Sequence, residues 1–154
     1  FAPLMDIPAE EWDRCYAINV RGLWQCCKAV IPAMKQQGGG KIINVSSNTP
    51  YKGVPNFLHY VSSKAAVVGL SRAMAREVGA FNIQVNTLCP DLIPDAGITA
   101  TQGDEADRRT VAGRCLQRTQ KPEDMVGAAL FLLGSGSDFV TGQSLLVNGG
   151  AHFL

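Results

Sequence analysis

The sequence has 154 residues, of which 46% are apolar and 18% are charged, and its formal net charge is +1. This length and composition are typical of one folded domain with a buried core, and the balanced charge offers no basic patch for nucleic acid. The longest apolar run, Ala128 to Leu133, is too short to cross a bilayer, so we expect no membrane partner. The five cysteines show no C-x-x-C spacing, which favours reduced thiols in the cytoplasm over a metal site or a disulfide framework.

The first half of the chain predicts a long helix, a strand and a second helix. The first helix, over 8–37, opens with a proline and acidic residues that suit a helix N-terminus. It is predicted to break near Asn19 and Pro32 and to stop at a run of three glycines. A short apolar strand over 41–45 and a loop follow, and the helical spacing of apolar residues then predicts a helix over 58–79.

The second half continues the alternation of strands and helices. Alternating apolar residues predict a strand over 82–88, and a polar, irregular segment that allows one short helix follows over 89–114. A helix over 121–133 and a last strand over 144–147 complete the pattern. Helices of this length between short apolar strands indicate an α/β fold with a parallel sheet. In such sheets ligands bind at the carboxyl ends of the strands.

The candidate catalytic side chains lie at that edge of the predicted sheet. Ser47 follows the first strand, and Tyr60 and Lys64 are one helical turn apart, so both project from one face of the next helix. A phenol has an ordinary pKa of about 10, and we expect the ammonium of Lys64 to lower the pKa of Tyr60 into the range for proton transfer. Ser47 is expected to hydrogen-bond the same substrate oxygen. A chance pair on an exposed helix is the alternative explanation for Tyr60 and Lys64 alone.

Five further motifs follow one another in a specific order. They are INV at Ile18–Val20, GKIINVSS at Gly40–Ser47, YVSSKAAVVGLSRAMARE at Tyr60–Glu77, IQVNTLCP at Ile83–Pro90 and TGQSLLVNGG at Thr141–Gly150. With these motifs the chain closely resembles the C-terminal portion of short-chain dehydrogenases/reductases, over essentially all of its 154 residues. The resemblance implies the C-terminal half of a Rossmann-type, doubly wound parallel sheet. It also implies an oxidoreductase that uses NAD or NADP.

The resemblance assigns roles to four residues. Tyr60 matches the catalytic acid/base of the family, and Lys64 matches the lysine that lowers the tyrosine pKa and hydrogen-bonds the nicotinamide ribose. Ser47 matches the serine that orients the substrate. Asn19 matches the asparagine that holds a water molecule in a proton relay. No metal ligand is implied.

The residues after the second predicted strand both follow and depart from the family pattern. In the family this stretch contacts the nicotinamide carboxamide, which makes Pro90 and Ile93 the expected cofactor contacts here. The family usually has glycine where this chain has Asp91, and threonine where it has Asp95. We expect these carboxylates near an anionic cofactor to weaken the contact, although aspartate tolerates glycine-like backbone angles better than most residues.

The function predicted from these observations is hydride transfer between a nicotinamide cofactor and a small alcohol or carbonyl substrate. A non-catalytic relative used as a binding or structural module is the alternative. We expect residues 1–154 to form a single partial domain, with a glycine-rich cofactor motif upstream of Phe1, and the full-length protein to be a homodimer or homotetramer. The choice between NAD and NADP and the identity of the substrate stay open.

Overall fold

A computed structural model gives the structure of the chain at residues 1–94 and 105–154. Three strands, β1 (Gly40–Val45), β2 (Ile83–Pro90) and β3 (Ser144–Val147), form a parallel sheet in the order β1-β2-β3. Their apolar sequences suit a parallel sheet, and the central strand β2 is largely buried while β1 and β3 are mostly half-buried. The predicted α/β class with a parallel sheet is therefore confirmed.

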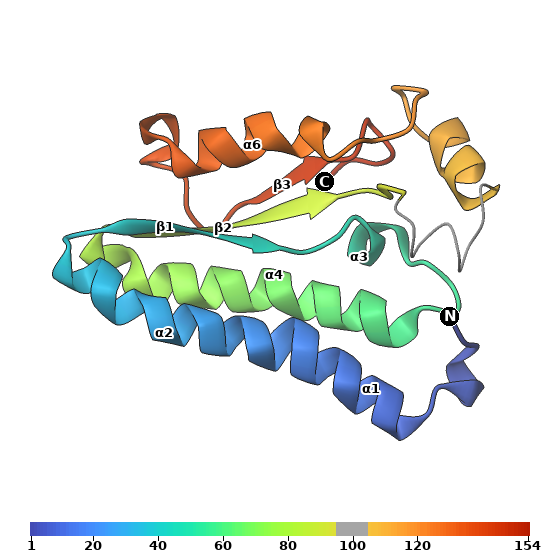
Figure 1. Cartoon of the computed structure of the whole chain (residues 1–154), viewed down its shortest axis with the longest axis horizontal. Coiled ribbons are helices and arrows are strands. Elements are labelled where there is room, and N and C mark those ends of the chain that lie inside the picture. The colour runs from blue at the N-terminus through green and yellow to red at the C-terminus, as the bar shows by residue number, and fades with distance from the viewer. Residues whose placement is uncertain (95–104) are drawn as a thin grey trace.

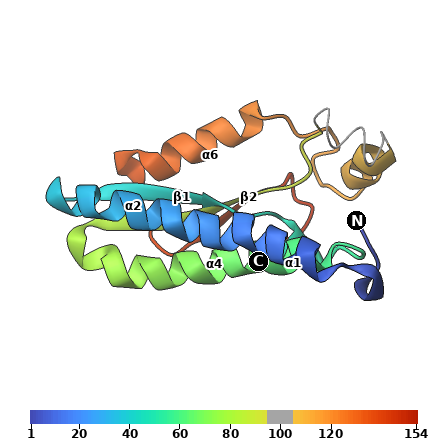
Figure 2. The ribbon, with the colours of Figure 1, turned by 60° about the horizontal axis from the view of Figure 1, so that its bottom comes forward.

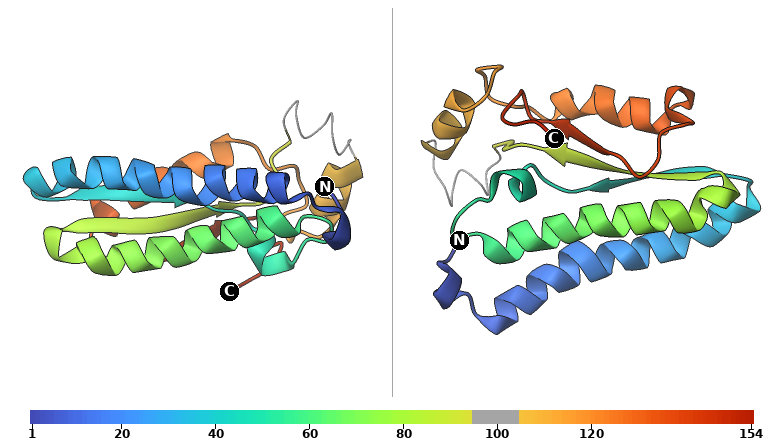
Figure 3. Two further views of the ribbon diagram at one scale, coloured as in Figure 1. Left: turned by 90° about the horizontal axis from the view of Figure 1, so that it is seen from below. Right: turned by 180° about the vertical axis from the view of Figure 1, so that it is seen from behind.

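Helices cover the two faces of the sheet (Figures 1 and 2). On one face lie α4 (Leu58–Val78) and the long helix made of α1 (Ala9–Tyr16), a π-helical turn η2 (Ala17–Gly22) and α2 (Leu23–Gln36). On the other face lies α6 (Glu123–Leu133), as the view from behind in Figure 3 also shows. A cluster of buried apolar side chains joins α2, α4, β1 and β2. Its fully buried members are Cys27, Ile42, Ala75, Val78, Ile83 and Val85.

The long first helix differs from the predicted one at Pro32. The sequence predicts a break there, but α2 continues through Pro32 to Gln36. A proline removes only one backbone hydrogen bond, and Ile31 and Met34 on either side of it pack against the buried cluster. This packing holds the helix together across the proline. Near Asn19 the helix does change, because the π-helical turn lies there.

The predicted glycine stop between α2 and β1 is confirmed. Gly38 and Gly39 both have a positive φ, of 84° and 155°. A Cβ atom on Gly39 would lie 2.7 Å from the Asn82 side-chain nitrogen and 2.8 Å from the Asn82 carbonyl oxygen. Gly39 therefore lets the chain turn tightly against the residue that precedes β2.

The connections around the site differ most from the prediction. β2 runs to Pro90, two residues further than predicted, because its last residues Cys89 and Pro90 pair with Leu146 and Val147 of β3. A four-residue helix, α3 (Thr49–Lys52), lies in the segment predicted as a loop. By contrast, the short helix at residues 105–112, which follows the part of the chain drawn in grey (Figure 1), lies in the segment where the sequence allows one. Asp95 lies outside the described residues. Within residues 1–94 and 105–154, no helix is long and apolar enough to cross a membrane.

Candidate active site

The end of β1 and the start of α4 bring Ser47 and Tyr60 together. The Ser46 backbone N–H donates to the Leu88 carbonyl at 2.9 Å and so extends the ladder between β1 and β2 by one residue. The Ser46 hydroxyl donates to the Lys64 carbonyl at 2.7 Å, which ties the strand end to α4. Ser47 is consequently buried beside the first turn of α4, and it lines the same cavity as Tyr60. The predicted substrate-orienting serine and the predicted acid/base thus share one site.

Lys64 lies one turn along α4 from Tyr60, as the sequence predicts. Its ammonium nitrogen donates to the Val45 carbonyl at 3.2 Å and lies 5.6 Å from the centroid of the Tyr60 ring. The carbonyl at the end of β1 therefore fixes the ammonium beside the phenol. An ammonium has three N–H donors, and among the described residues this carbonyl is its single hydrogen-bond acceptor.

The protonation equilibria of this pair are set mainly by burial. Burial raises the pKa of the Tyr60 phenol, and the nearby Ser47 hydroxyl, which lowers that pKa, does not offset the effect of burial. Burial also lowers the pKa of the Lys64 ammonium. The direction for Tyr60 is opposite to the one expected from a neighbouring lysine alone, because removing both groups from water disfavours both of their charged forms.

Asn19 reaches the same part of α4 through Ser63. It lies in the π-helical turn η2, and its side-chain nitrogen donates to the Ser63 hydroxyl at 3.0 Å and lies 3.4 Å from the Cys15 sulfur. The Ser63 hydroxyl in turn donates to the Tyr60 carbonyl at 2.8 Å. A π-helical turn widens the backbone and often occurs at functional sites. Here it places the Asn19 amide beside the helix that carries Tyr60 and Lys64.

A cavity of about 420 Å³ opens in front of Ser47 and Tyr60. Pro90 and Ile93, the two expected cofactor contacts, also line it, as does Lys52 of α3. Its volume is in the range of small-molecule sites. The structure therefore brings Ser47, Tyr60, Pro90 and Ile93 to one cavity at the carboxyl ends of β1 and β2.

Asp91, which stands where the family has glycine, is held between two cations. One carboxylate oxygen is 2.8 Å from the Lys52 ammonium, and the other is 2.9 Å from Arg114 Nε. Burial alone would raise the pKa of Asp91, but the hydrogen bonds that its carboxylate accepts from Lys52 and Arg114 oppose this, and the pKa is lowered. The carboxylate is therefore ionised and neutralised by its own neighbours.

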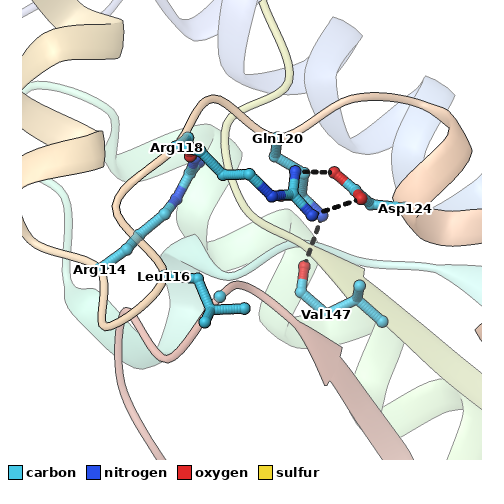
Figure 4. A pocket seen from close by; sticks show the side chains of 7 residues that line it. Arg114, Leu116, Arg118, Gln120, Asp124 and Val147 are labelled. Carbon is cyan, nitrogen blue, oxygen red and sulfur yellow. Dashed lines mark hydrogen bonds and ion pairs between the residues drawn. The ribbon is translucent and has the colours of Figure 1, made fainter.

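Arg114 and the residues after it fasten this segment to the rest of the fold. Arg114 also donates to the Leu92 and Arg118 carbonyls, at 2.8 and 2.9 Å. A smaller cavity of about 160 Å³ lies here, lined by Arg114, Arg118, Gln120 and Asp124 among others (Figure 4). Arg118 donates twice to Asp124 at 2.7 Å, and the Gln120 side chain donates to the Val147 carbonyl at 2.7 Å (Figure 4). Because these polar groups bind one another, this cavity is structural.

The site residues fit the nicotinamide and ribose end of a dinucleotide. Lys64 carries N–H donors beyond the one used by Val45, and such donors suit ribose hydroxyls. Pro90 and Ile93 offer an apolar wall next to Tyr60. Within the described parts of the chain, no glycine-rich turn leads from a strand into a helix, so the phosphate end of the cofactor finds no matching site there.

The sequence does not single out Lys52, and it does not predict the contact of Arg114 with Asp91. Lys52 lies on a four-residue helix, which is too short to show a periodic pattern. Arg114 is 23 residues from Asp91, and no local pattern connects them. The departure of Asp91 from glycine was the one available signal, since a buried carboxylate requires a cation or donors nearby.

Known proteins match the chain over nearly its whole length. The family model described as enoyl-(acyl carrier protein) reductase matches residues 1–152. The 3-oxoacyl-[acyl-carrier-protein] reductase FabG of Chlamydia trachomatis is 38% identical over 149 residues, which are 97% of this chain and 60% of the relative. A gluconate 5-dehydrogenase from Burkholderia cenocepacia, solved in complex with NADP and tartrate, aligns with a TM-score of 0.93 and 31% identity over 97% of this chain and 59% of that one. An NAD⁺-bound xylitol dehydrogenase aligns with a TM-score of 0.90 and 29% identity, over 97% and 64% of the two chains.

These matches and the parallel α/β sheet identify the family of the chain. The chain belongs to the short-chain dehydrogenase/reductase family, and it corresponds to the C-terminal portion of those proteins. It spans about 60% of the length of the relatives that it matches.

Proposed function

We propose that the full-length protein transfers hydride between NAD or NADP and a small alcohol or carbonyl substrate. The observation that carries this proposal is that Ser47 and Tyr60 line one cavity while the Lys64 ammonium lies 5.6 Å from the centroid of the Tyr60 ring. The names of the matched relatives support the reaction class, since they include reductases and dehydrogenases that bind NADP or NAD⁺. We further propose that the cavity accepts a polar substrate, as gluconate and xylitol are for two of those relatives.

Each residue of the site has a distinct part in this proposal. The bound nicotinamide supplies or accepts the hydride. Tyr60 donates a proton to the substrate oxygen during reduction and takes it back during oxidation. The Ser47 hydroxyl holds the same oxygen, and Lys64 binds the ribose through the N–H donors that Val45 leaves unused. Asn19 positions this part of α4 through Ser63, and its amide is expected to hold a water molecule that exchanges the proton with solvent.

The decisive experiment is Tyr60→Phe in the full-length protein, with Tyr16→Phe as a matched control. The hydroxyl of Tyr16 lies in α1, where the ring stacks on Trp12. General acid–base catalysis contributes about 10²- to 10⁴-fold, so we expect Tyr60→Phe to lower kcat by that factor and Tyr16→Phe to leave it within twofold. Cofactor oxidation is followed at 340 nm, and circular dichroism verifies that both variants fold. More than a tenth of the wild-type activity in folded Tyr60→Phe would remove Tyr60 from the mechanism.

A titration of the wild-type protein with NADH and NADPH separates this proposal from a non-catalytic module. A catalytic protein binds one of them and turns over a carbonyl substrate, whereas a structural module binds neither. The same titration assigns the cofactor as NAD or NADP.

We also propose that the full-length protein is a dimer or a tetramer in the cytoplasm. Large apolar side chains on the outer faces of the helices support assembly, for example Trp24 on α2 and Leu130 on α6, which are 45% and 65% exposed. All five cysteines are free thiols, which supports a reducing compartment.

A further inference from the structure

We propose that Lys52 binds a carboxylate or another anionic group of the substrate, so that the substrates of this protein are hydroxy acids or keto acids. This inference rests on the proposed function, because it concerns the same cavity. It identifies the end of the substrate that lies away from the reacting carbon.

Lys52 lies at the same cavity as the candidate catalytic residues. The lysine ends α3, five residues after Ser47, and the left-handed Gly53 turns the chain immediately after it. Lys52 lines the same 420 Å³ cavity as Ser47 and Tyr60. A ligand held by the two hydroxyls therefore has an ammonium group within the same enclosure.

Lys52 belongs to a charged cluster with Asp91 and Arg114. Asp91 carries one negative charge and contacts two cations, with one carboxylate oxygen on Lys52 and the other on Arg114. The three side chains together carry a net charge of +1, and the Asp91 and Arg114 side chains are only 6% and 1% exposed. This excess positive charge lies in a partly dry environment, where electrostatic attraction to an anion is stronger than in water.

Lys52 and Arg114 differ in how many of their hydrogen-bond donors are already used. Arg114 uses Nε, Nη1 and Nη2 in hydrogen bonds to Asp91 and to the Arg118 and Leu92 carbonyls, so it is fully engaged in holding the fold. Lys52 is 29% exposed, and Asp91 is its one acceptor among the described residues. Because an ammonium has three donors, Lys52 can bind an anion and keep Asp91. Arg114 offsets the repulsion between Asp91 and that anion.

The cavity that holds Lys52 and Tyr60 also has an apolar part. Val54, Phe57 and Leu92 line it together with Lys52 and Tyr60. These apolar side chains suit the carbon backbone of a substrate, while the charged and hydroxyl groups hold its two ends. The arrangement favours a molecule with an alcohol or carbonyl at one end and an acid at the other.

The test compares acids with their uncharged amides in the full-length protein with its cofactor. The probes are 3-hydroxybutyrate with 3-hydroxybutyramide and tartrate with tartramide, assayed as substrates and, by competition against any turned-over alcohol, as inhibitors. The variants are Lys52→Met, Lys52→Arg and, as a control, Lys35→Met, whose ammonium lies over Phe81 and away from the cavity. Thermal unfolding verifies that each variant is folded.

A charge-assisted hydrogen bond corresponds to about tenfold to a hundredfold in binding. We expect Lys52→Met to weaken the binding of the acids by this factor and to change the binding of the amides by less than threefold. Lys52→Arg should keep the preference for acid over amide, and Lys35→Met should leave the binding of both unchanged. Equal losses for acid and amide, or a wild-type protein that does not prefer the acid, would overturn the role of Lys52. Turnover of neutral alcohols with no acid preference would overturn this inference and leave the proposed function standing, whereas the absence of cofactor binding and turnover would overturn both.

Discussion

The Asp91 carboxylate lies just after β2 and contacts two further segments of the chain. It joins the strand end to α3 through Lys52 and to the segment before α6 through Arg114. Both Asp91 and Arg114 are almost completely buried. Removing one partner of a buried ion pair leaves the other charge in a poorly solvating environment, which is costly. Asp91 thus connects three segments of the site, and it also lines the 420 Å³ cavity.

We therefore expect Asp91→Asn to destabilise the protein by about 3 kcal/mol, because Arg114 loses its buried counter-charge. Urea unfolding of the full-length protein measures the change. Asp138→Asn is the matched control, since Asp138 pairs with Lys41 but is 68% exposed, and Lys41 keeps its bonds to the Gly134 carbonyl and the Ser137 hydroxyl. An equally small loss in both variants would mean that water already solvates Arg114.

The stability difference between wild type and Asp91→Asn should depend on pH if its origin is electrostatic. The pKa of Asp91 is lowered in the folded protein, whereas an aspartate in the unfolded chain titrates at about 3.9. The stabilisation from Asp91 is then fully present above about pH 4 and is lost as the pH falls through its folded pKa. The gap between wild type and Asp91→Asn should narrow below about pH 4 and stay constant from pH 5 to 7. A gap that is independent of pH would assign the effect to packing.

At the scale of elements, the sequence predicts the parts that have a repeating local pattern. β1, β3, α4 and α6 are long or apolar enough for their periodicity to identify them, and the structure agrees with each to within two residues. The end of β2 could not be predicted, because Cys89 and Pro90 become strand residues only by pairing with β3, which lies about 55 residues later. α3 and the continuation through Pro32 also depend on tertiary packing.

The residues of the site likewise include some that the local sequence predicts and others that depend on contacts between distant segments. Ser47, Tyr60 and Lys64 can be found from their spacing and from the family resemblance, because the catalytic spacing is local and short. The Lys52–Asp91–Arg114 cluster joins residues that are 39 and 23 positions apart. A buried carboxylate requires cations nearby, so the sequence indicates that Asp91 has a partner. It does not indicate that the partners are Lys52 and Arg114. The direction of the Tyr60 pKa likewise depends on burial that the sequence does not show.

The turn between α2 and β1 provides a prediction at this scale. Gly39→Ala places a Cβ atom 2.7 to 2.8 Å from Asn82 and should cost about 2–3 kcal/mol, through both the clash and the positive φ. Gly38→Ala is the matched control, because Gly38 also has a positive φ but a Cβ atom there meets nothing within 4 Å. We expect it to cost about 1 kcal/mol. Urea unfolding of the two variants gives the comparison, and equal losses would show that Asn82 moves aside.

At the scale of the whole molecule, the chain exposes more surface than its size requires. A typical monomeric protein of 16.5 kDa exposes about 7,500 Å², whereas this chain exposes 8994 Å². The excess includes large apolar side chains on α6, such as Leu130 and Leu133, which are 65% and 53% exposed. Among the described strands β1 and β3 are the two edges of the sheet, and each pairs with β2 alone. Such edges and patches favour association with further polypeptide.

This surface leads to a prediction for residues 1–154 expressed by themselves. The chain should associate or aggregate, and it should not bind NAD(H) or NADP(H), because a dinucleotide site needs a glycine-rich turn that leads from a strand into a helix N-terminus. The one run of three glycines, Gly38–Gly40, instead leads from a helix into β1. Light scattering and calorimetry with both cofactors, run beside the full-length protein, measure the two properties. A soluble and cooperatively folding chain that binds either cofactor with a micromolar Kd would contradict the prediction, since the phosphates would then be held by a different group of residues.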